Sequence, residues 1–273
     1  MPPPAADAPC PEQAFNATAL KWHTCAWLLL PVLVFLTGWM HWYAALPLTL
    51  LTAAGLAPRK RKEPPTRDSL PAFPLFTRSS FLALAAFAAL TALSGWGEWV
   101  NQHPDHIVRN ACLRELVASP WPVIFPDGNV LIYNTGFWLV PALAGKLAGL
   151  DAARVLVVLW GTWGLFLSWL WLCVFSGRRS LLLALLMAAF GSLLNLQCWL
   201  GLDLFRLHYF GTAEQIMCSA NASIPVLLFF IFLASGRMPL YWMPILFAAT
   251  AFYSPLAALG GLPLAACQWH RQW

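Results

Sequence analysis

The sequence predicts an all-α fold, a polytopic integral-membrane helical bundle with about eight membrane segments. Of the 273 residues, 60% are hydrophobic and only 10% are charged, whereas soluble domains carry about 25% charged residues. Sixteen Trp residues fit the same class because Trp favours the headgroup region of a bilayer. We therefore expect the lipid bilayer as a partner and, without a broad basic face, no nucleic acid.

Familiar catalytic and metal-binding motifs do not occur in the sequence. The seven cysteines are scattered without paired spacing, which predicts neither a disulfide framework nor a zinc site. Walker-type glycine loops, HExxH and GxSxG patterns are also missing. Soluble-type nucleotide chemistry therefore has no support in the sequence.

The chain divides into four parts by composition. Residues 1–20 are rich in Pro and Ala and predict a disordered tail, and residues 21–57 hold two apolar runs that predict a membrane hairpin. Residues 58–78 form a linker with the basic run Arg59–Lys62, which predicts a cytoplasmic location by the positive-inside rule. Residues 79–273 are expected to form the main membrane domain.

The third segment, residues 81–97, is then expected to run out of the cytoplasm. It places the following loop, Glu98 to Asp127, on the non-cytoplasmic side, where we expect interfacial helices. Residues 130–150 allow two topologies: a full span would put Arg178–Arg179 outside the cytoplasm, and a re-entrant segment would put them inside. Glycine and proline inside this segment favour the re-entrant arrangement. The later apolar runs cover residues 155–175, 181–200, 216–234, 240–259 and 262–266.

Asp105 is the strongest candidate for a functional carboxylate in the loop after the third segment. It follows Pro104 at the start of a helix-compatible stretch, residues 106–117. The carboxylate could serve as a helix N-cap, or it could activate an acceptor hydroxyl or bind a divalent cation. Both roles are compatible with each other.

Residues 106–117 predict a short helix at the membrane surface. Its apolar side is expected to face the acyl chains and consists of Ile107, Val108, Ala111, Cys112 and Leu116. Arg109 and Arg114 would then face headgroups or the phosphates of a lipid-linked substrate, and for Arg114 we prefer ordinary headgroups.

A second polar loop, residues 202–215, is expected on the same side of the membrane. Arg206 suits a phosphate because a planar guanidinium binds two phosphate oxygens at once, and His208 lies beside it in sequence. An interfacial anchor is the alternative role for Arg206.

Three stretches together resemble the GT-C class of polyprenol-dependent membrane glycosyltransferases. They are PDHIVRNACLRELVASPWPV, LIYNTGFWLVPALAGKLAGL and the later FYSPLAALGGLPLA. The first carries an acidic residue followed by a basic residue, an Asn-Ala-x-Leu stretch and a WPV segment. The second carries a Pro-Ala-Leu helix, and the third a Ser-Pro turn. In this sequence the acidic and basic positions are Asp105 and Arg109.

The resemblance implies a helical membrane bundle that transfers a sugar from a polyprenyl-phosphate donor at the non-cytoplasmic face of a bacterial inner membrane. Asp105 would be the acidic residue near the acceptor, and the second acidic position falls on Glu98 or Asp127. The chain ends without the further spans and outer domain of many members, so we expect a minimal or truncated one. The chemistry is compatible with a divalent cation, Mg²⁺ or Mn²⁺, but one carboxylate alone does not make a metal site.

The remaining predicted site residues are substrate-binding. His106, Arg109, Asp127, Arg206 and His208 are the candidates, and Arg109, Arg206 and His208 would hold the donor phosphate. Two alternatives stay open: a transporter or flippase for a lipid-linked or anionic substrate, and a non-catalytic membrane subunit of a larger enzyme. Binding and movement of a lipid phosphate without any covalent product would favour the transporter. Inseparable co-purification with a larger membrane enzyme would favour the non-catalytic subunit.

Overall fold

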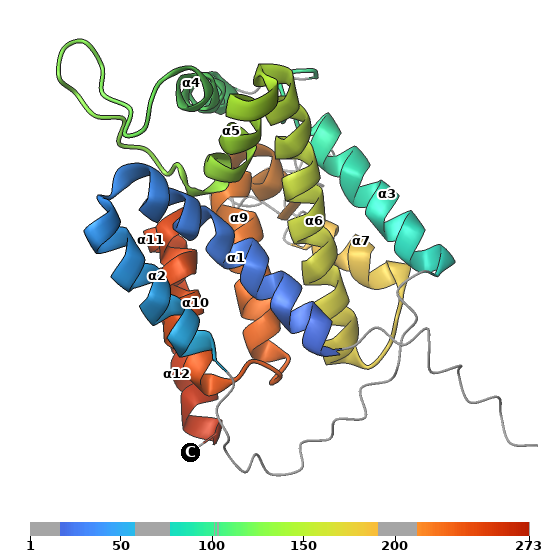
Figure 1. Ribbon diagram of the computed structural model, residues 1–273. Coiled ribbons are helices and arrows are strands. Elements are labelled where there is room, and N and C mark those ends of the chain that lie inside the picture. The colour runs from blue at the N-terminus through green and yellow to red at the C-terminus, as the bar shows by residue number, and fades with distance from the viewer. Residues whose placement is uncertain (1–16, 58–76, 101, 103, 191–211, 273) are drawn as a thin grey trace, which may run out of the picture.

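The computed structural model describes residues 17–57, 77–100, 102, 104–190 and 212–272, and every regular element in these ranges is helical (Figure 1). The predicted tail and the basic linker lie almost wholly outside the described residues, as do residues 191–200 of the predicted run 181–200. The elements are α1 (Ala17–Trp39), α2 (Trp42–Leu56), α3 (Arg78–Leu93), α4 (Pro104–Ala118), α5 (Gly136–Ala148), α6 (Leu150–Ser176), α7 (Leu181–Ala189), α9 (Thr212–Ala234), η2 (Leu240–Trp242), α10 (Met243–Tyr253), α11 (Pro255–Gly260) and α12 (Leu262–Gln272).

Three of the described helices are long and apolar enough to cross a membrane. They cover Thr18–Trp39 in α1, Leu150–Ser176 in α6 and Gln215–Ala234 in α9. This confirms the all-helical class and indicates a membrane protein. The other apolar helices are shorter than a full span, so the number of about eight membrane segments stays a prediction.

Helices α3 and α6 run antiparallel and are tied together at both ends. At one end the Arg179 guanidinium, just beyond α6, donates to the Ser80 hydroxyl in the first turn of α3. At the other end Arg154, in the first turns of α6, forms an ion pair with Glu98, which follows α3. In the middle the hydroxyls of Thr91 and Thr162 are 2.7 Å apart. These contacts hold α3 against α6 at both ends and in the middle.

Helix α5 does not cross the bundle. Its first turn lies at mid-depth, where the Phe137 ring is 6.4 Å from the Trp27 ring. Its later residue Gly145 packs against Val117 of α4 and Ala153 at the start of α6. The 13 residues of α5 span only about 20 Å at 1.5 Å per residue. The helix therefore runs from mid-depth to the end where α4 lies, and the choice between a full span and a re-entrant segment for residues 130–150 stays a prediction.

Trp27 is the centre of the core. Its ring stacks on Trp160 at 5.0 Å and on Tyr253 at 5.7 Å. The indole N–H donates to the Trp160 carbonyl, and the Tyr253 hydroxyl donates to the Trp27 carbonyl. Buried aromatic side chains with satisfied polar atoms contribute large apolar area without a desolvation cost. Trp27 thus joins α1, α6 and α10 at the middle of the bundle.

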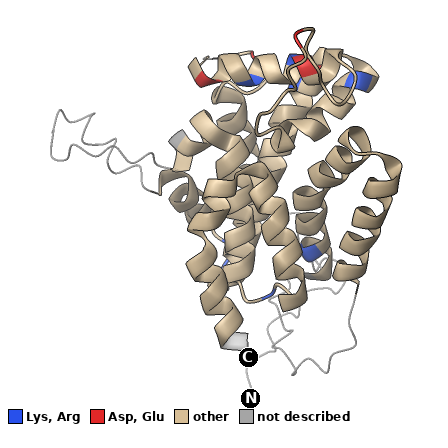
Figure 2. Ribbon diagram, turned by 90° about the vertical axis from the view of Figure 1, so that its left-hand side faces the viewer, with Lys and Arg blue, Asp and Glu red and all other residues tan. Residues whose placement is uncertain are grey.

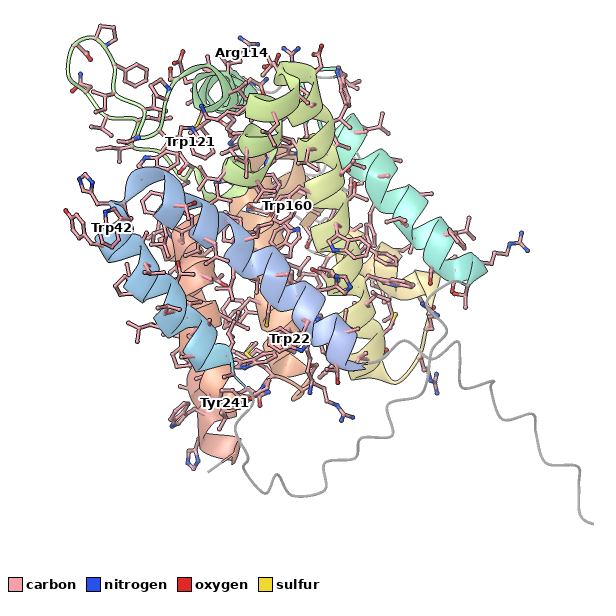
Figure 3. The ribbon with its side chains drawn as sticks, in the orientation of Figure 1. Trp22, Trp42, Arg114, Trp121, Trp160 and Tyr241 are labelled. Atoms are coloured by element: carbon pink, nitrogen blue, oxygen red, sulfur yellow. The ribbon has the colours of Figure 1, made fainter. Side chains whose placement is uncertain are left out.

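Among the described residues, acidic side chains gather at one end of the bundle, whereas aromatic side chains occur along its length (Figure 2, Figure 3). The acidic residues drawn in Figure 2 lie at the α4 end, whereas basic residues occur at both ends. In Figure 3, Trp121 lies toward the α4 end, Trp22 and Tyr241 lie toward the other end, and Trp42 and Trp160 lie at about the same level between them. Aromatic residues at both ends of the bundle are compatible with the enrichment of Trp and Tyr at the two interfaces of a membrane.

The packing around Trp27 predicts the effect of a small substitution. A methyl group at Gly164 would lie 2.6 Å from Ile224 and 2.7 Å from Trp27, so Gly164→Ala should lower the stability by about 1–3 kcal/mol through overpacking. Gly260→Ala is the matched control, because nothing lies within 4 Å of its added methyl. Thermal unfolding in detergent, followed by Trp fluorescence, measures both. Equal midpoints for the two variants would contradict the packing described.

Candidate functional site

Helix α9 is broken at Ser219, whose φ of −150° and ψ of 47° are not helical. The residues before the break therefore form the end of one helix, and such an end leaves four carbonyl groups without intrahelical partners. Unpaired carbonyls at membrane depth cost several kcal/mol each, so irregular backbone there needs protein donors. The break creates this requirement next to α4.

Four side chains donate to the four successive carbonyls before the break. The Ser223 hydroxyl donates to Gln215 at 3.2 Å, and the Trp96 indole donates to Ile216 at 3.1 Å. His106 Nε2 lies 2.8 Å from the Met217 carbonyl, and the Arg109 guanidinium donates to the Cys218 carbonyl. Arg109 also reaches the Ser219 hydroxyl at 3.4 Å. We call this set of four donors the break clamp.

The break clamp explains why α4 faces the bundle with polar residues. His106 is 1% exposed and the side chain of Arg109 is 8% exposed, and the apolar Cys112 and Leu116 are buried on the same face. Ile107 and Val108 are exposed. The prediction that Ile107, Val108, Ala111, Cys112 and Leu116 share one outward side is therefore wrong. The physical reason is that the carbonyls of α9 require donors, and this need outweighs apolar periodicity.

Asp105 lies in the first turn of α4, one residue after Pro104. Proline occupies the first helical position readily because its missing N–H would have no partner there, so Asp105 is inside the helix and is not its N-cap. A carboxylate in the first turn is stabilised by the helix dipole. The side chain is 53% exposed and its carboxylate is 3.9 Å from Arg109. Asp105 thus presents a carboxylate to the surface beside the break clamp.

Glu98 lies in a separate ion cluster at the same end of the bundle. Its side chain is only 11% exposed and pairs with Arg114 at 2.7 Å and with Arg154. Arg154 also pairs with Asp151 at 2.8 Å. Burial acts to raise the pKa of Glu98, but the hydrogen bonds and charges of Arg114 and Arg154 outweigh it and lower the pKa. These contacts link α4 to the start of α6 and make Glu98 a structural carboxylate.

Asp127 lies in the loop that follows α4 and is engaged locally. Its carboxylate accepts from the backbone N–H of Asn129 at 3.1 Å and from the Asn129 side chain at 2.6 Å. These bonds lower the pKa of Asp127 and hold the carboxylate at the tight turn of Phe125 to Gly128, which the Gly128 N–H closes on the Phe125 carbonyl. The loop flanking this turn has the isolated bridge between Ile124 and Val130. Asp127 is therefore a turn residue, and no described contact joins it to Asp105.

The two remaining predicted residues, Arg206 and His208, lie outside the described residues. Within the described part of the chain, no group of three His, Cys, Asp or Glu side chains could hold a metal ion. The exposed Asp105 carboxylate, by itself, does not fit Mg²⁺ or Mn²⁺, which need several oxygen ligands.

Sequence reasoning missed Trp96 and Ser223 as members of the break clamp. The signal for the break was the polar stretch Ser219 to Ser223 within an apolar run. Small polar residues inside a membrane segment often satisfy backbone groups. No sequence signal identified Trp96, which closes the apolar run after α3.

Comparisons with known proteins give no match for this chain. No family model, no curated protein and no solved structure matches its sequence or fold.

The break clamp predicts unequal effects for two arginines on one helix. Arg109→Met removes the donor to the Cys218 carbonyl and should lower stability by about 1–3 kcal/mol. It should also speed amide exchange in residues 219–222. Arg114→Met is the control, because its side chain is 54% exposed and such an ion pair contributes about 0–1 kcal/mol. Thermal unfolding with hydrogen–deuterium exchange tests both variants. Unchanged exchange around Ser219 in Arg109→Met would rule out the clamp.

The ion cluster predicts a pH dependence of stability. The folded-state pKa of Glu98 lies below its ordinary value of 4.5, so the stability it contributes is present above that pH and is lost as pH falls through the folded pKa. Wild-type protein should therefore lose more stability than Glu98→Gln as the pH falls from neutral to below 4.5. Unfolding midpoints across this range provide the measurement, and parallel pH curves for the two proteins would argue against it.

Proposed function

We propose that the protein is a membrane glycosyltransferase that moves a sugar from a polyprenyl-phosphate donor to an acceptor hydroxyl at the α4 end, on the non-cytoplasmic side of the membrane. The observation that carries the proposal is the exposed Asp105 carboxylate at the start of α4. It is held beside the buried Arg109, at the positions where the sequence resembles GT-C glycosyltransferases. Asp105 is more exposed than Glu98, with 53% of its side chain accessible against 11%, and Asp127 is engaged in its own turn, so we prefer Asp105 as the acid.

The chemistry requires a base for the acceptor. Asp105 accepts the proton of the acceptor hydroxyl as the acceptor oxygen bonds to the anomeric carbon of the sugar. The bond between that carbon and the phosphate oxygen breaks, and the polyprenyl phosphate leaves with the electron pair. Positive charge near the leaving phosphate stabilises it. His106 and Arg109 are occupied by the carbonyls of α9, so we assign them to positioning α4, and the assignment of the phosphate to Arg206 and His208 depends on the sequence alone.

The fixed position of Asp105 supports this assignment further. His106 and Arg109 bind α9 one residue and four residues after Asp105, so the first turn of α4 cannot rotate freely. A catalytic group held by neighbouring packing contributes more than a mobile one because its orientation is set before the reaction.

A transport function is the second candidate, and the broken α9 favours it. Discontinuous membrane helices line the substrate sites of many secondary transporters, and α5 is also a partial segment. A transporter or flippase of a lipid-linked substrate would use the same end of the bundle without bond making. A non-catalytic membrane subunit remains the third candidate from the sequence.

Activity of an Asp105 variant tests the enzyme proposal. Asp105→Asn should lower sugar transfer from a panel of polyprenyl-phosphate sugars about 10²–10⁴-fold, because the general base is lost. Asp151→Asn is the control: Asp151 is a highly exposed carboxylate at the same end, whose pair with Arg154 lies outside the proposed site. Sugar transfer by Asp105→Asn at the wild-type rate would contradict the catalytic assignment. Lipid movement without any glycosylated product would favour the transporter.

A further inference from the structure

An apolar groove of about 590 Å³ runs between α6 and α9. Its lining includes Leu172 and Phe175 from α6 and Leu227 and Ile231 from α9. The few polar residues of the lining, among them Gln215, belong mostly to the beginning of α9. The groove therefore becomes wholly apolar toward the ends of the two helices, and its volume is in the range of about 300–1,000 Å³ that small-molecule sites occupy.

The two helices that form the groove end in the same way. Ser176-Gly177-Arg178 closes α6 and Ser235-Gly236-Arg237 closes α9. Each glycine has a left-handed φ, 67° for Gly177 and 69° for Gly236, as in common helix C-caps.

The arginines of the two closing turns are held alike. The backbone N–H of Arg178 donates to the Ser176 hydroxyl at 3.3 Å, and the N–H of Arg237 donates to the Ser235 hydroxyl at 3.3 Å. The equal turns place both arginines just past the apolar groove: each follows the last groove residue of its helix, Phe175 or Ala234, by three positions.

The charge at this end has one sign among the described residues. The starts of α1 and α3 and the two closing turns contain Lys21, Arg78, Arg178, Arg179 and Arg237, and no Asp or Glu. The described acidic residues lie at the α4 end (Figure 2). A groove that is apolar along its length and basic at its end is complementary to a lipid with an acyl chain and an anionic headgroup.

We propose that this groove binds an anionic phospholipid, with an acyl chain between α6 and α9 and the phosphate held by Arg178 and Arg237. Guanidinium groups suit a phosphate because they donate two parallel hydrogen bonds. The bound lipid fills the apolar groove, and its phosphate accepts hydrogen bonds from the two guanidinium groups. The site lies at the opposite end from Asp105 and is independent of the proposed glycosyl transfer.

Lipid retention by the full chain tests the proposal. The protein is purified in detergent, supplied with phosphatidylglycerol or phosphatidylcholine of identical acyl chains, and examined by native mass spectrometry. Wild-type protein should retain phosphatidylglycerol preferentially. The double variant Arg178→Gln/Arg237→Gln should retain it about 30-fold less, since each basic residue near a membrane surface contributes about fivefold. The matched control, Lys21→Gln/Arg78→Gln, makes the same charge change at the same end away from the groove and should retain the lipid.

The groove is tested separately from the charge. Ala234→Trp places a bulky ring in the groove and should lower phosphatidylglycerol retention with both arginines present, whereas Leu185→Trp on the exposed face of α7 should not. Three results would overturn the proposal: equal retention of the two lipids by wild-type protein, equal loss in the two double variants, or full retention by Ala234→Trp. Thermal unfolding of each variant confirms that the protein remains folded.

Discussion

The four carbonyl groups that precede Ser219 are the constraint on which the α4 end of the molecule depends. A helix that ends among buried residues such as Ile216 and Cys218 leaves these acceptors without intrahelical partners and without water, so protein donors must reach them. The donors come from three places: Trp96 after α3, His106 and Arg109 on α4, and Ser223 within α9 itself. The break therefore fixes how α3, α4 and α9 are arranged, although these elements are far apart in sequence.

This constraint also decides which residues of α4 are left for chemistry. Because His106 and Arg109 turn inward, the residues next to them, Asp105 among them, face outward. The helix presents an unusual surface, with exposed Ile107 and Val108 beside a carboxylate. Such a surface suits the membrane interface, where apolar side chains and charged groups are both accommodated. The polar inner face and the outward carboxylate are thus two consequences of one break.

The sequence was sufficient for the parts of the structure that follow from composition and local pattern. Hydropathy predicted the helical membrane class, and Pro104 and Asp105 predicted the start of a short helix, as α4 confirms. The glycines and proline of residues 130–150 favoured a re-entrant segment, and this topology stays a prediction, although α5 has only 13 residues. The sequence was less able to predict which face of a helix packs against the bundle. The apolar pattern of α4 predicted the wrong set of residues for the side that faces the acyl chains, because the need for donors arises from α9, about 100 residues away.

The individual site residues show the same limit. Glu98, Asp105 and Asp127 are all carboxylates in one loop, and spacing alone does not separate them. Their roles differ because their partners differ. Arg154 in α6 forms an ion pair with Glu98, whereas Asn129, two residues away, donates to Asp127. Only the second of these partners is near in sequence. The sequence of this chain therefore identifies the candidate loop more readily than the acid within it.

The buried charge of Arg109 and the break in α9 support each other. A guanidinium that is 8% exposed with a carboxylate 3.9 Å away would be costly to bury on its own. The end of the first half of α9 supplies the negative pole of a helix dipole and free carbonyl oxygens at this position, which stabilise a cation. The arginine in turn removes the desolvation cost of the carbonyls. A continuous helix at Ser219 would leave Arg109 without these oxygens, and loss of Arg109 would leave the helix end with one donor fewer, so each feature stabilises the other.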